Sequence, residues 1–357
     1  MGIRFDKDSR RATNGPLIFF SILRDPAFEE EINGAFYSGL SFYAYRFPHD
    51  KMISFGSSEG FVEGLGTPGF VIGMFDPSLP LVTIPYKGHH KEEVSGSLYT
   101  MPQESTSRED YDAEVTGIIR DLRDMEHGKV VASRVVVKEA SVDLAERFLD
   151  FCDSYPENFI FCFSTPATGC WIGASPELLL EGREGRIESM ALAGTRVAGT
   201  PGEWDAKNRE EQSIVTDYIA RVFQRNGLTP ERGETFTKVS GSIEHICTPV
   251  TGVLSSDRDF ELSGLLRDLS PTPALCGNPK EFALEEIRKY EKFDRGCYGG
   301  FCGPFRSAED FRFNVVLRCA SVSERRYALY VGGGITSASD PASEWTETNL
   351  KLPTNFV

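Results

Sequence analysis

The chain has 357 residues, of which 40% are hydrophobic, and its formal net charge is −15 at pH 7. The hydrophobic content is enough for a sizeable core, and the length fits one large domain or two smaller ones. So acidic a chain is not expected to be a general binder of nucleic acid or other polyanions. The first residues lack the apolar stretch of a secretory signal, and no run of about 20 apolar residues predicts a membrane span.

The cysteine pattern favours buried, reduced thiols. Eight cysteines stand at positions 152, 162, 170, 247, 276, 297, 302 and 319. No pair has the Cys-x-x-Cys spacing of a zinc site, and several lie within apolar segments. We therefore expect reduced cysteines and a cytoplasmic location.

Residues 1–105 are predicted to be irregular, with short strands and no catalytic residues. Apolar and alternating stretches predict strands at 40–47 and 69–75, and the segment 76–80 predicts a turn after the second. A polar run then joins this part to the rest of the chain.

Residues 106–352 contain longer predicted elements, beginning with a helix over 108–127 and a buried strand that starts at Lys129. A hairpin is predicted over 175–192, and Asn278 is predicted to cap a helix. Further strands are predicted at 159–163, 170–174, 243–253, 297–303, 310–320 and 327–332, and further helices at 142–154, 203–226 and 258–269. Runs of strands with helices between them predict an α+β or mixed α/β fold.

The segment 330–351 predicts a strand, three glycines and then a helix. Asp340 suits the N-cap of this helix, on which Glu344, Glu347 and Lys351 share one face. Two carboxylates beside a bare glycine backbone indicate a site for a hard cation, with N–H groups available to an anion. A capped surface helix with an ordinary ion pair is equally compatible with the sequence.

Two residues in the middle of the chain are candidates for proton transfer. Lys129 opens an apolar strand, where a lysine usually extends to water but could act as a base if it is partly desolvated. Glu177 precedes three leucines, and a carboxyl group against apolar surface has a raised pKa and suits a general acid. A strand-end glutamate that faces solvent fits the same pattern.

Three further polar residues stand out against apolar surroundings. Glu211 lies on the apolar stripe of its predicted helix and needs either Lys207 as an ion-pair partner or a cation shared with other carboxylates. Arg318 lies in an otherwise apolar predicted strand and is either paired internally or free to bind a carboxylate. His245 is by default a hydrogen-bonded core histidine.

Eight segments occur in an order that is specific to one family. They are Lys129-Val-Val-Ala-Ser-Arg, Gly173-Ala-Ser-Pro-Glu-Leu-Leu-Leu, Ala191-Leu-Ala-Gly-Thr-Arg, Glu244-His-Ile-Cys-Thr-Pro, Pro271-Thr-Pro-Ala-Leu-Cys-Gly, Phe293-Asp-Arg-Gly-Cys-Tyr-Gly-Gly, Val316-Leu-Arg-Cys-Ala and Gly332-Gly-Gly-Ile with Glu344-Trp-Thr-Glu-Thr-Asn-Leu-Lys. With these segments the chain resembles the chorismate-utilising enzymes, which include anthranilate, aminodeoxychorismate, isochorismate and salicylate synthases. The resemblance covers the last two-thirds of the chain, and residues 1–105 fit it only loosely.

Two features favour the isochorismate synthase branch. Family members that use ammonia typically carry Gln where this chain has Lys129, whereas members that add water carry Lys. The segment Pro271-Thr-Pro-Ala-Leu is also similar to that of isochorismate synthases. A salicylate synthase, which would also eliminate pyruvate, remains the nearest alternative. An amine-transferring subunit with a glutaminase partner and a non-catalytic chorismate-binding protein are the others.

The resemblance implies Mg²⁺-dependent isomerisation of chorismate, for menaquinone or siderophore biosynthesis. It implies Lys129 as the base that activates water and Glu177 as the acid that protonates the departing hydroxyl. The implied metal ligands are Glu211, Glu344 and Glu347. The residues implied to contact the substrate are Gly194, Thr195, His245, Ala274, Leu275, Tyr298, Arg318, Gly333, Gly334 and Lys351.

The fold implied by the resemblance is a single chorismate-binding domain over 1–357, with two antiparallel-rich sheets packed face to face and helices outside. Within it, 106–352 is the motif-bearing part. We expect a monomer without a glutaminase subunit. Two positions depart from the family pattern, because Gln212 stands where the family often has His after the helix glutamate, and Ser270 stands where it often has His before Pro-Thr-Pro.

Overall fold

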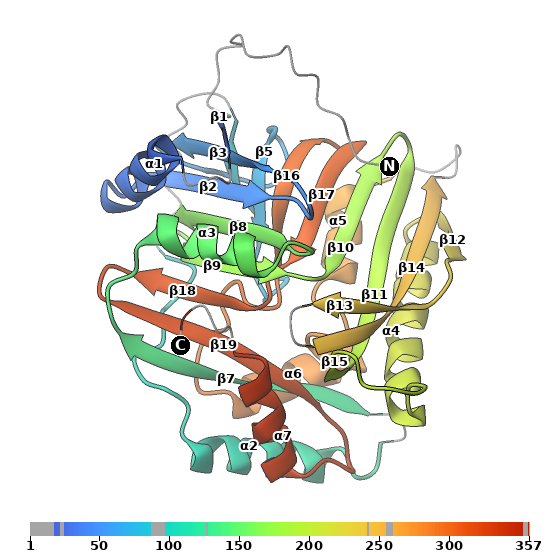
Figure 1. The fold of residues 1–357 in the computed structure, drawn as a ribbon. Coiled ribbons are helices and arrows are strands. Elements are labelled where there is room, and N and C mark those ends of the chain that lie inside the picture. Colours follow the sequence, from blue (N-terminus) through green and yellow to red (C-terminus); the bar gives the residue numbers. More distant parts are fainter. Residues whose placement is uncertain are drawn as a thin grey trace.

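The structure is a computed structural model that describes residues 18–21, 25–86, 97–125, 128–240, 243–254, 260–352 and 356. Its strands form two sheets, and every strand pairing recorded between them is antiparallel (Figure 1). The first sheet has nine strands in the order β1 (Ile18–Ser21), β3 (Met52–Ser58), β2 (Ser41–Arg46), β8 (Phe159–Thr165), β9 (Gly169–Ser175), β18 (Cys319–Ser323), β19 (Arg326–Ile335), β7 (Lys129–Glu139) and β15 (Gly277–Asn278).

The second sheet has ten strands. Their order is β12 (Leu228–Arg232), β14 (Ile243–Leu254), β11 (Arg186–Val197), β10 (Leu178–Arg183), β17 (Asp310–Val315), β16 (Phe301–Ser307), β5 (Gly69–Gly73), β6 (Val82–Pro85) and β4 (Val62–Glu63), with β13 (Phe236–Ser240) paired to β14 off this path. The predicted α+β architecture with two antiparallel sheets is therefore confirmed. Residues before 105 supply strands to both sheets.

Aromatic side chains fill the space between the two sheets. The rings of Tyr43 on β2 and Phe70 on β5 stack with centroids 5.1 Å apart, which joins one strand of each sheet directly. Trp171 on β9 is fully buried in the same layer. Because an antiparallel strand alternates its faces, residues such as these cover the inner face while their neighbours pack outward. The sheets are thus held face to face by one shared core.

Seven helices cover the outside. They are α1 (Pro26–Tyr37), α2 (Arg108–Asp121), α3 (Leu144–Ser154), α4 (Ala206–Arg225), α5 (Leu262–Leu269), α6 (Lys280–Tyr290) and α7 (Pro341–Leu350) among the described residues. Helices α1 and α3 pack on the nine-stranded sheet through Phe28 and Phe148, whose rings lie 5.4 Å apart. Helices α4 and α5 cover the ten-stranded sheet, and α2 and α7 lie side by side at one end (Figure 1).

Two of the chain's crossings between the sheets lie next to each other. Residues between β9 and β10 form the first crossing, and residues between β17 and β18 form the second. Each crossing accepts a backbone hydrogen bond from the strand that leads into the other. Val315 N of β17 donates to Glu177 O at 3.0 Å, and Ala174 N of β9 donates to Arg318 O at 3.2 Å. The prediction of one continuous strand over 310–320 was wrong here, because β17 ends at Val315 and the chain then passes through Arg318, whose φ is +47°, into β18 of the other sheet.

Two other sequence predictions need correction. Helix α2 ends at Asp121, earlier than the predicted residue 127, although its apolar stripe is buried as expected. Asn278 does not cap a helix, because it pairs with Lys129 as part of β15, and Pro279 takes the N-cap position without a side-chain hydrogen bond.

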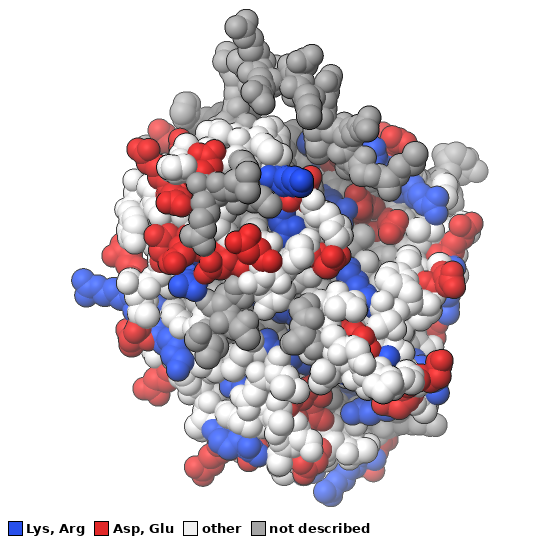
Figure 2. Space-filling model, in the orientation of Figure 1, with Lys and Arg blue, Asp and Glu red and all other residues white. Residues whose placement is uncertain are grey.

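The cysteine prediction is confirmed, since all eight cysteines are buried and free. No helix among the described residues is long and apolar enough to cross a membrane. On the face shown in Figure 2, acidic and basic side chains are interspersed with uncharged ones.

Candidate active site

One cavity brings together nearly all of the residues that the sequence singled out. It is lined by residues of both sheets, of α4 and α7, and of the segment between α5 and α6. The predicted residues on its wall are Lys129, Glu177, Gly194, Thr195, Glu211, His245, Ala274, Leu275, Tyr298, Arg318, Gly333, Gly334, Glu347 and Lys351. Glu344 does not line the cavity but lies directly behind Gly333. Residues more than 200 positions apart in sequence therefore form one site.

Glu177 lies on the first crossing between the sheets and is only 2% exposed. Its backbone is fixed, because its carbonyl accepts from Asn314 Nδ2 and Val315 N, both at 3.0 Å. Its side-chain Oε1 is buried and has no hydrogen-bond partner among the described residues. Burial raises the pKa of Glu177 to about 8, and the positive charges of Lys238 and Lys129 oppose this rise. The carboxyl group is thus protonated at neutral pH and exposed to the cavity, as a general acid must be.

Lys238, on β13, was not identified from the sequence, but its positive charge acts on Glu177. Burial lowers the pKa of Lys238, and the hydrogen-bond contact of its Nζ is with Met190 Sδ at 3.5 Å. Its charge has the larger of the two opposing effects on the pKa of Glu177. The sequence interpretation missed Lys238 because a single lysine in a short polar strand has the pattern of an exposed strand residue.

Substitution Lys238→Met is expected to move the alkaline limb of the pH–rate profile. Removing the positive charge leaves burial less opposed, so the pKa of Glu177 rises further above its ordinary value. The acid then stays protonated to higher pH, and kcat/KM is expected to fall at a higher pH than in the wild type. Measuring kcat/KM from pH 6 to 10 tests this, with Lys138→Met on exposed β7 surface as the control. A limb that stays in place or moves to lower pH contradicts the assignment.

Lys129 begins β7 and is 5% exposed, so the alternative of a lysine that extends to water is wrong. Its Nζ forms an ion pair with Glu211 of α4. Burial favours the neutral form of Glu211, but Lys129, Lys351 and Lys207 together outweigh it and the pKa of this carboxyl is lowered. The sequence alternative of an ion pair between Lys207 and Glu211 is not formed within the described residues, and Lys207 lies on the wall of the same cavity.

Three carboxylates approach the glycine backbone at the end of β19. A methyl group at Gly333 would lie 3.2 Å from Glu344 Oε2 and 4.0 Å from Glu347 Oε1. A methyl group at Gly334 would lie 2.5 Å from the Cε atom of Lys129 and 3.6 Å from Glu211 Oε1. A methyl group at Gly334 would therefore displace the end of the Lys129 side chain, and one at Gly333 would require Glu344 to shift slightly. The three carboxylates come from α4 and α7, which meet β19 here.

Helix α7 is held firmly enough to place its two glutamates. Asp340 caps it by accepting from Ser343 N at 2.9 Å, and Pro341 begins it, as predicted. Trp345 anchors its opposite side, with the guanidinium of Arg134 4.1 Å from the ring centroid and the ring of Tyr111 at 5.5 Å. Arg134 also donates to Thr348 Oγ1 at 2.8 Å.

The carboxylates are suited to a divalent cation, although they are partly engaged by lysines. Glu347 accepts from Lys351 at 2.7 Å, and this charge lowers its pKa. Glu344 Oε1 accepts from Ser339 at 2.7 Å, whereas its buried Oε2 has no hydrogen-bond partner among the residues that the structure describes, and burial raises the pKa of Glu344. No group of three His, Cys, Asp or Glu side chains in the described part of the chain is already arranged as a metal site. Oxygen donors around an unpartnered carboxylate nevertheless fit Mg²⁺, which would replace the two ammonium groups as counter-charge.

Arg318 and Tyr298 make the cavity suited to an anion as well. Arg318 forms no ion pair within the described residues, and burial lowers its pKa to about 10. Tyr298 is buried beside Gly332, where a methyl group would lie 3.0 Å from the phenol oxygen. Strand β18 pairs with β19 only as far as Leu329, so beyond that point the glycines of β19 have β7 as their paired neighbour. A buried arginine beside accessible backbone is a common arrangement for binding a carboxylate.

Asn208 is a site residue that the sequence interpretation missed. Its Oδ1 accepts from Thr195 N at 3.2 Å, and a methyl group at Gly194 would lie 2.9 Å from the same oxygen. Gly194 has φ of +72°, a conformation that favours glycine. Asn208 lies three residues before Glu211 on α4, so helical spacing was the available signal.

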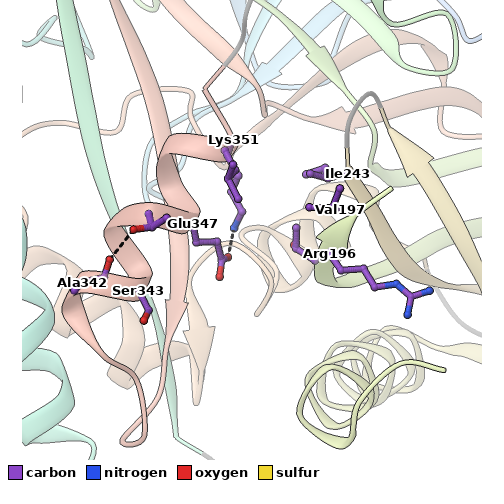
Figure 3. Close-up of a pocket in the computed structure, with 10 residues that line it drawn as sticks. Arg196, Val197, Ile243, Ala342, Ser343, Glu347 and Lys351 are labelled. Carbon is purple, nitrogen blue, oxygen red and sulfur yellow. Dashed lines mark hydrogen bonds and ion pairs between the residues drawn. The ribbon is translucent and has the colours of Figure 1, made fainter. Parts of the chain in front are cut away.

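An outer pocket of about 540 Å³ lies between α7 and the end of β11 and shares Thr195, Ile243, Glu347 and Lys351 with the cavity. Figure 3 shows Glu347 and Lys351 facing this pocket, opposite Val197 and Ile243. Arg196 stands at its rim and is held by Glu244 at 2.6 Å and by stacking on Trp204 at 4.0 Å. The charged residues Glu347 and Lys351 therefore line both the outer pocket and the inner cavity.

The two departures from the family pattern lie outside the cavity wall. Gln212 is buried and donates to Thr248 Oγ1 at 2.8 Å and to Ala191 O at 3.0 Å. Ser270 is buried, and its carbonyl accepts from Lys280 at 2.9 Å. Both residues therefore stabilise the surroundings of the site.

Comparison with known proteins places this geometry in a family. A family model for chorismate binding enzymes matches residues 84–354. The chain belongs to the chorismate-binding enzyme family. Among sequence relatives, isochorismate synthase EntC of Escherichia coli is 32% identical over 241 residues, which cover 63% of this chain and 61% of that protein. The vibriobactin-specific isochorismate synthase of Vibrio cholerae is 30% identical, over 70% of this chain and 66% of that protein. The chain thus matches less than two thirds of the length of these relatives.

Solved structures of chorismate-binding enzymes share the fold. A 2,3-dihydroxybenzoate-specific isochorismate synthase from Bacillus anthracis aligns with a TM-score of 0.75 and 24% identity, covering 92% of this chain and 98% of that one. Anthranilate synthase component I of Streptococcus pneumoniae aligns with a TM-score of 0.65 and 14% identity, covering 99% and 96%. At these identities the likeness concerns the fold alone, so the choice of reaction depends on the site.

Proposed function

We propose that this chain is an isochorismate synthase, which isomerises chorismate to isochorismate. The observation that carries the proposal is that a buried lysine and a buried protonated glutamate both line one cavity. These residues, Lys129 and Glu177, come from different elements of the fold. The sequence relatives whose names are isochorismate synthases support the same choice.

In the proposed reaction the base and the acid act on opposite ends of one rearrangement. In its neutral form Lys129 takes a proton from water, whose oxygen bonds to C2 of the chorismate ring. The ring double bond shifts, and the bond between C4 and its hydroxyl oxygen breaks. Glu177 gives its proton to that leaving oxygen, so that water is released and the atoms balance. A protonated carboxyl group held in an apolar environment is prepared for this step.

Chorismate carries two carboxylates, and we assign them to different parts of the cavity. Arg318, Tyr298 and the backbone at Gly333 and Gly334 would hold the enolpyruvyl carboxylate. A magnesium ion held by Glu211, Glu347 and Glu344 would supply positive charge for the ring carboxylate. Lys351 would balance the remaining carboxylate charge. Gly194, Thr195, Ala274 and Leu275 would shape the space around the ring.

The direct test is to incubate the purified protein with chorismate and Mg²⁺ and to identify products by liquid chromatography and mass spectrometry. Isochorismate without salicylate is the expected result. Salicylate together with pyruvate would identify a salicylate synthase instead, and an aminated product that requires ammonia would identify an amine-transferring subunit. Absence of any product, with chorismate still bound, would identify a non-catalytic binding protein. Isochorismate would serve menaquinone or siderophore biosynthesis.

A further inference from the structure

The guanidinium of Arg318 is already oriented on two sides before any ligand binds. Its Nη1 donates to Ser240 Oγ at 2.7 Å and to Ser240 O at 3.0 Å. Ser240 is buried, and its own hydroxyl donates to Asn158 Oδ1 at 3.1 Å. On the other side, Nη2 lies 3.1 Å from Nε2 of His245. The orientation of this arginine therefore depends on Ser240 and His245 together.

The contacts of His245 determine which ring nitrogen carries the proton. Nδ1 lies 2.8 Å from the carbonyl oxygen of Gly194, which can only accept, so Nδ1 is the donor. The Thr195 hydroxyl lies 3.3 Å from the same nitrogen. Nη2 of Arg318 can only donate, so Nε2 must accept. Two independent contacts thus require the same neutral tautomer, and both ring nitrogens are used within the protein.

A neutral histidine suits this position because it orients the arginine without neutralising it. Burial, with the nearby Arg318 charge, lowers the pKa of His245 to about 4, so the ring stays uncharged at neutral pH. A carboxylate in its place would pair with the guanidinium and compete with an anionic ligand. Because a guanidinium binds a carboxylate through two parallel N–H bonds, the plane in which it lies decides how well the ligand fits.

We propose that His245 is a positioning residue for Arg318, whose guanidinium plane it fixes for the enolpyruvyl carboxylate, and that it is not itself a substrate ligand. The inference rests on the proposed function for the identity of the ligand, and on the described contacts for the role of the histidine. It replaces the direct substrate contact that the family resemblance implied for His245.

Two substitutions separate the two hydrogen bonds of the ring. His245→Asn keeps an N–H near Gly194 O but loses the acceptor for Arg318. His245→Gln keeps an acceptor near Arg318 but loses the donor. With binding measured by calorimetry in the Glu177→Gln background, where chorismate is not consumed, we expect His245→Asn to raise the chorismate Kd about tenfold, or about 1.4 kcal/mol. The Gln substitution is expected to change it by less than about threefold.

A double-mutant cycle distinguishes positioning from direct contact. If His245 acts through Arg318, then His245→Asn has no further effect on the chorismate Kd once Arg318 is replaced by Ala. Equal losses in the Asn and Gln variants, a full additional loss in the Arg318→Ala background, or no loss in the Asn variant would each overturn the inference. Thermal melting of each variant identifies any that fail to fold.

Crystal structures of the two variants without ligand keep the inference testable if chorismate is not the substrate. We expect the Arg318 guanidinium to rotate away from its present plane in His245→Asn and to keep it in His245→Gln. An unchanged guanidinium in the Asn variant would overturn the positioning role, whatever the ligand is. Failure of chorismate to bind the wild-type protein would instead refute the proposed function.

Discussion

Replacing Glu177 by Gln is expected to lower kcat for chorismate isomerisation by about 10²–10⁴. The amide has nearly the same shape as the protonated carboxyl group but cannot transfer a proton to the leaving oxygen. The wild-type residue is buried with one oxygen unpartnered, so the substitution breaks no hydrogen bond within the described residues that would unfold the site. Glu184→Gln in the exposed turn of the same hairpin is the control and should retain full activity. Unchanged turnover in the Glu177 variant would remove it from the mechanism.

The same residue predicts a pH dependence with a definite sign. Because burial raises the pKa of Glu177 to about 8, the required protonated form is present below this pH and is lost above it. Activity should therefore fall as pH rises through about 8. Stability should follow the same direction, since a carboxyl group with a raised pKa in the folded state contributes stability at low pH that is lost as pH rises through that value. Thermal melting at pH 6 and 9 should show a smaller decrease for Glu177→Gln than for the wild type.

Replacing Lys129 by Met is expected to lower kcat by a similar factor, about 10²–10⁴, because Met fills the space but cannot accept a proton from water. The substitution also leaves Glu211 without its ion-pair partner. The affinity for Mg²⁺ should then rise rather than fall, because the cation no longer has to replace an ammonium group at Glu211. Turnover and Mg²⁺ binding by calorimetry are measured on the same preparation.

Lys138→Met provides the matched control for Lys129, since it removes a lysine from the exposed end of the same strand. It should leave both turnover and Mg²⁺ affinity unchanged. A Lys129 variant that loses activity and Mg²⁺ affinity together would indicate that the lysine supports the metal site and does not act as the base.

The composition of the site could be predicted from the sequence because its residues are parts of ordered motifs. The spacing of Glu344, Glu347 and Lys351 fixes their common helix face, and helical spacing also placed Glu211 toward the core. Family resemblance supplied the acid and the base, whose individual signals were weak. None of this required knowledge of how distant segments pack.

What the sequence could not show depends on three-dimensional arrangement. Arg318 stands among apolar residues that favour a continuous strand, yet in the fold this strand ends at Val315 and Arg318 has a positive φ. Asn278 is a residue type that favours helix N-caps, but in the fold it pairs with Lys129 of β7 and becomes part of a strand. The charge of Lys238 affects the pKa of Glu177, and both ring nitrogens of His245 form contacts within the protein. Both effects arise between elements that are distant in sequence, so no local sequence pattern predicts them.

The two neighbouring crossings, between β9 and β10 and between β17 and β18, have a consequence beyond the site itself. One carries Glu177 and the other carries Arg318, so the proposed acid and the proposed anion-binding arginine would move with the separation and angle of the sheets. That separation is set by aromatic stacks such as Tyr43 with Phe70, which do not line the cavity. Natural selection or laboratory evolution can thus adjust turnover through interior residues that never meet the substrate.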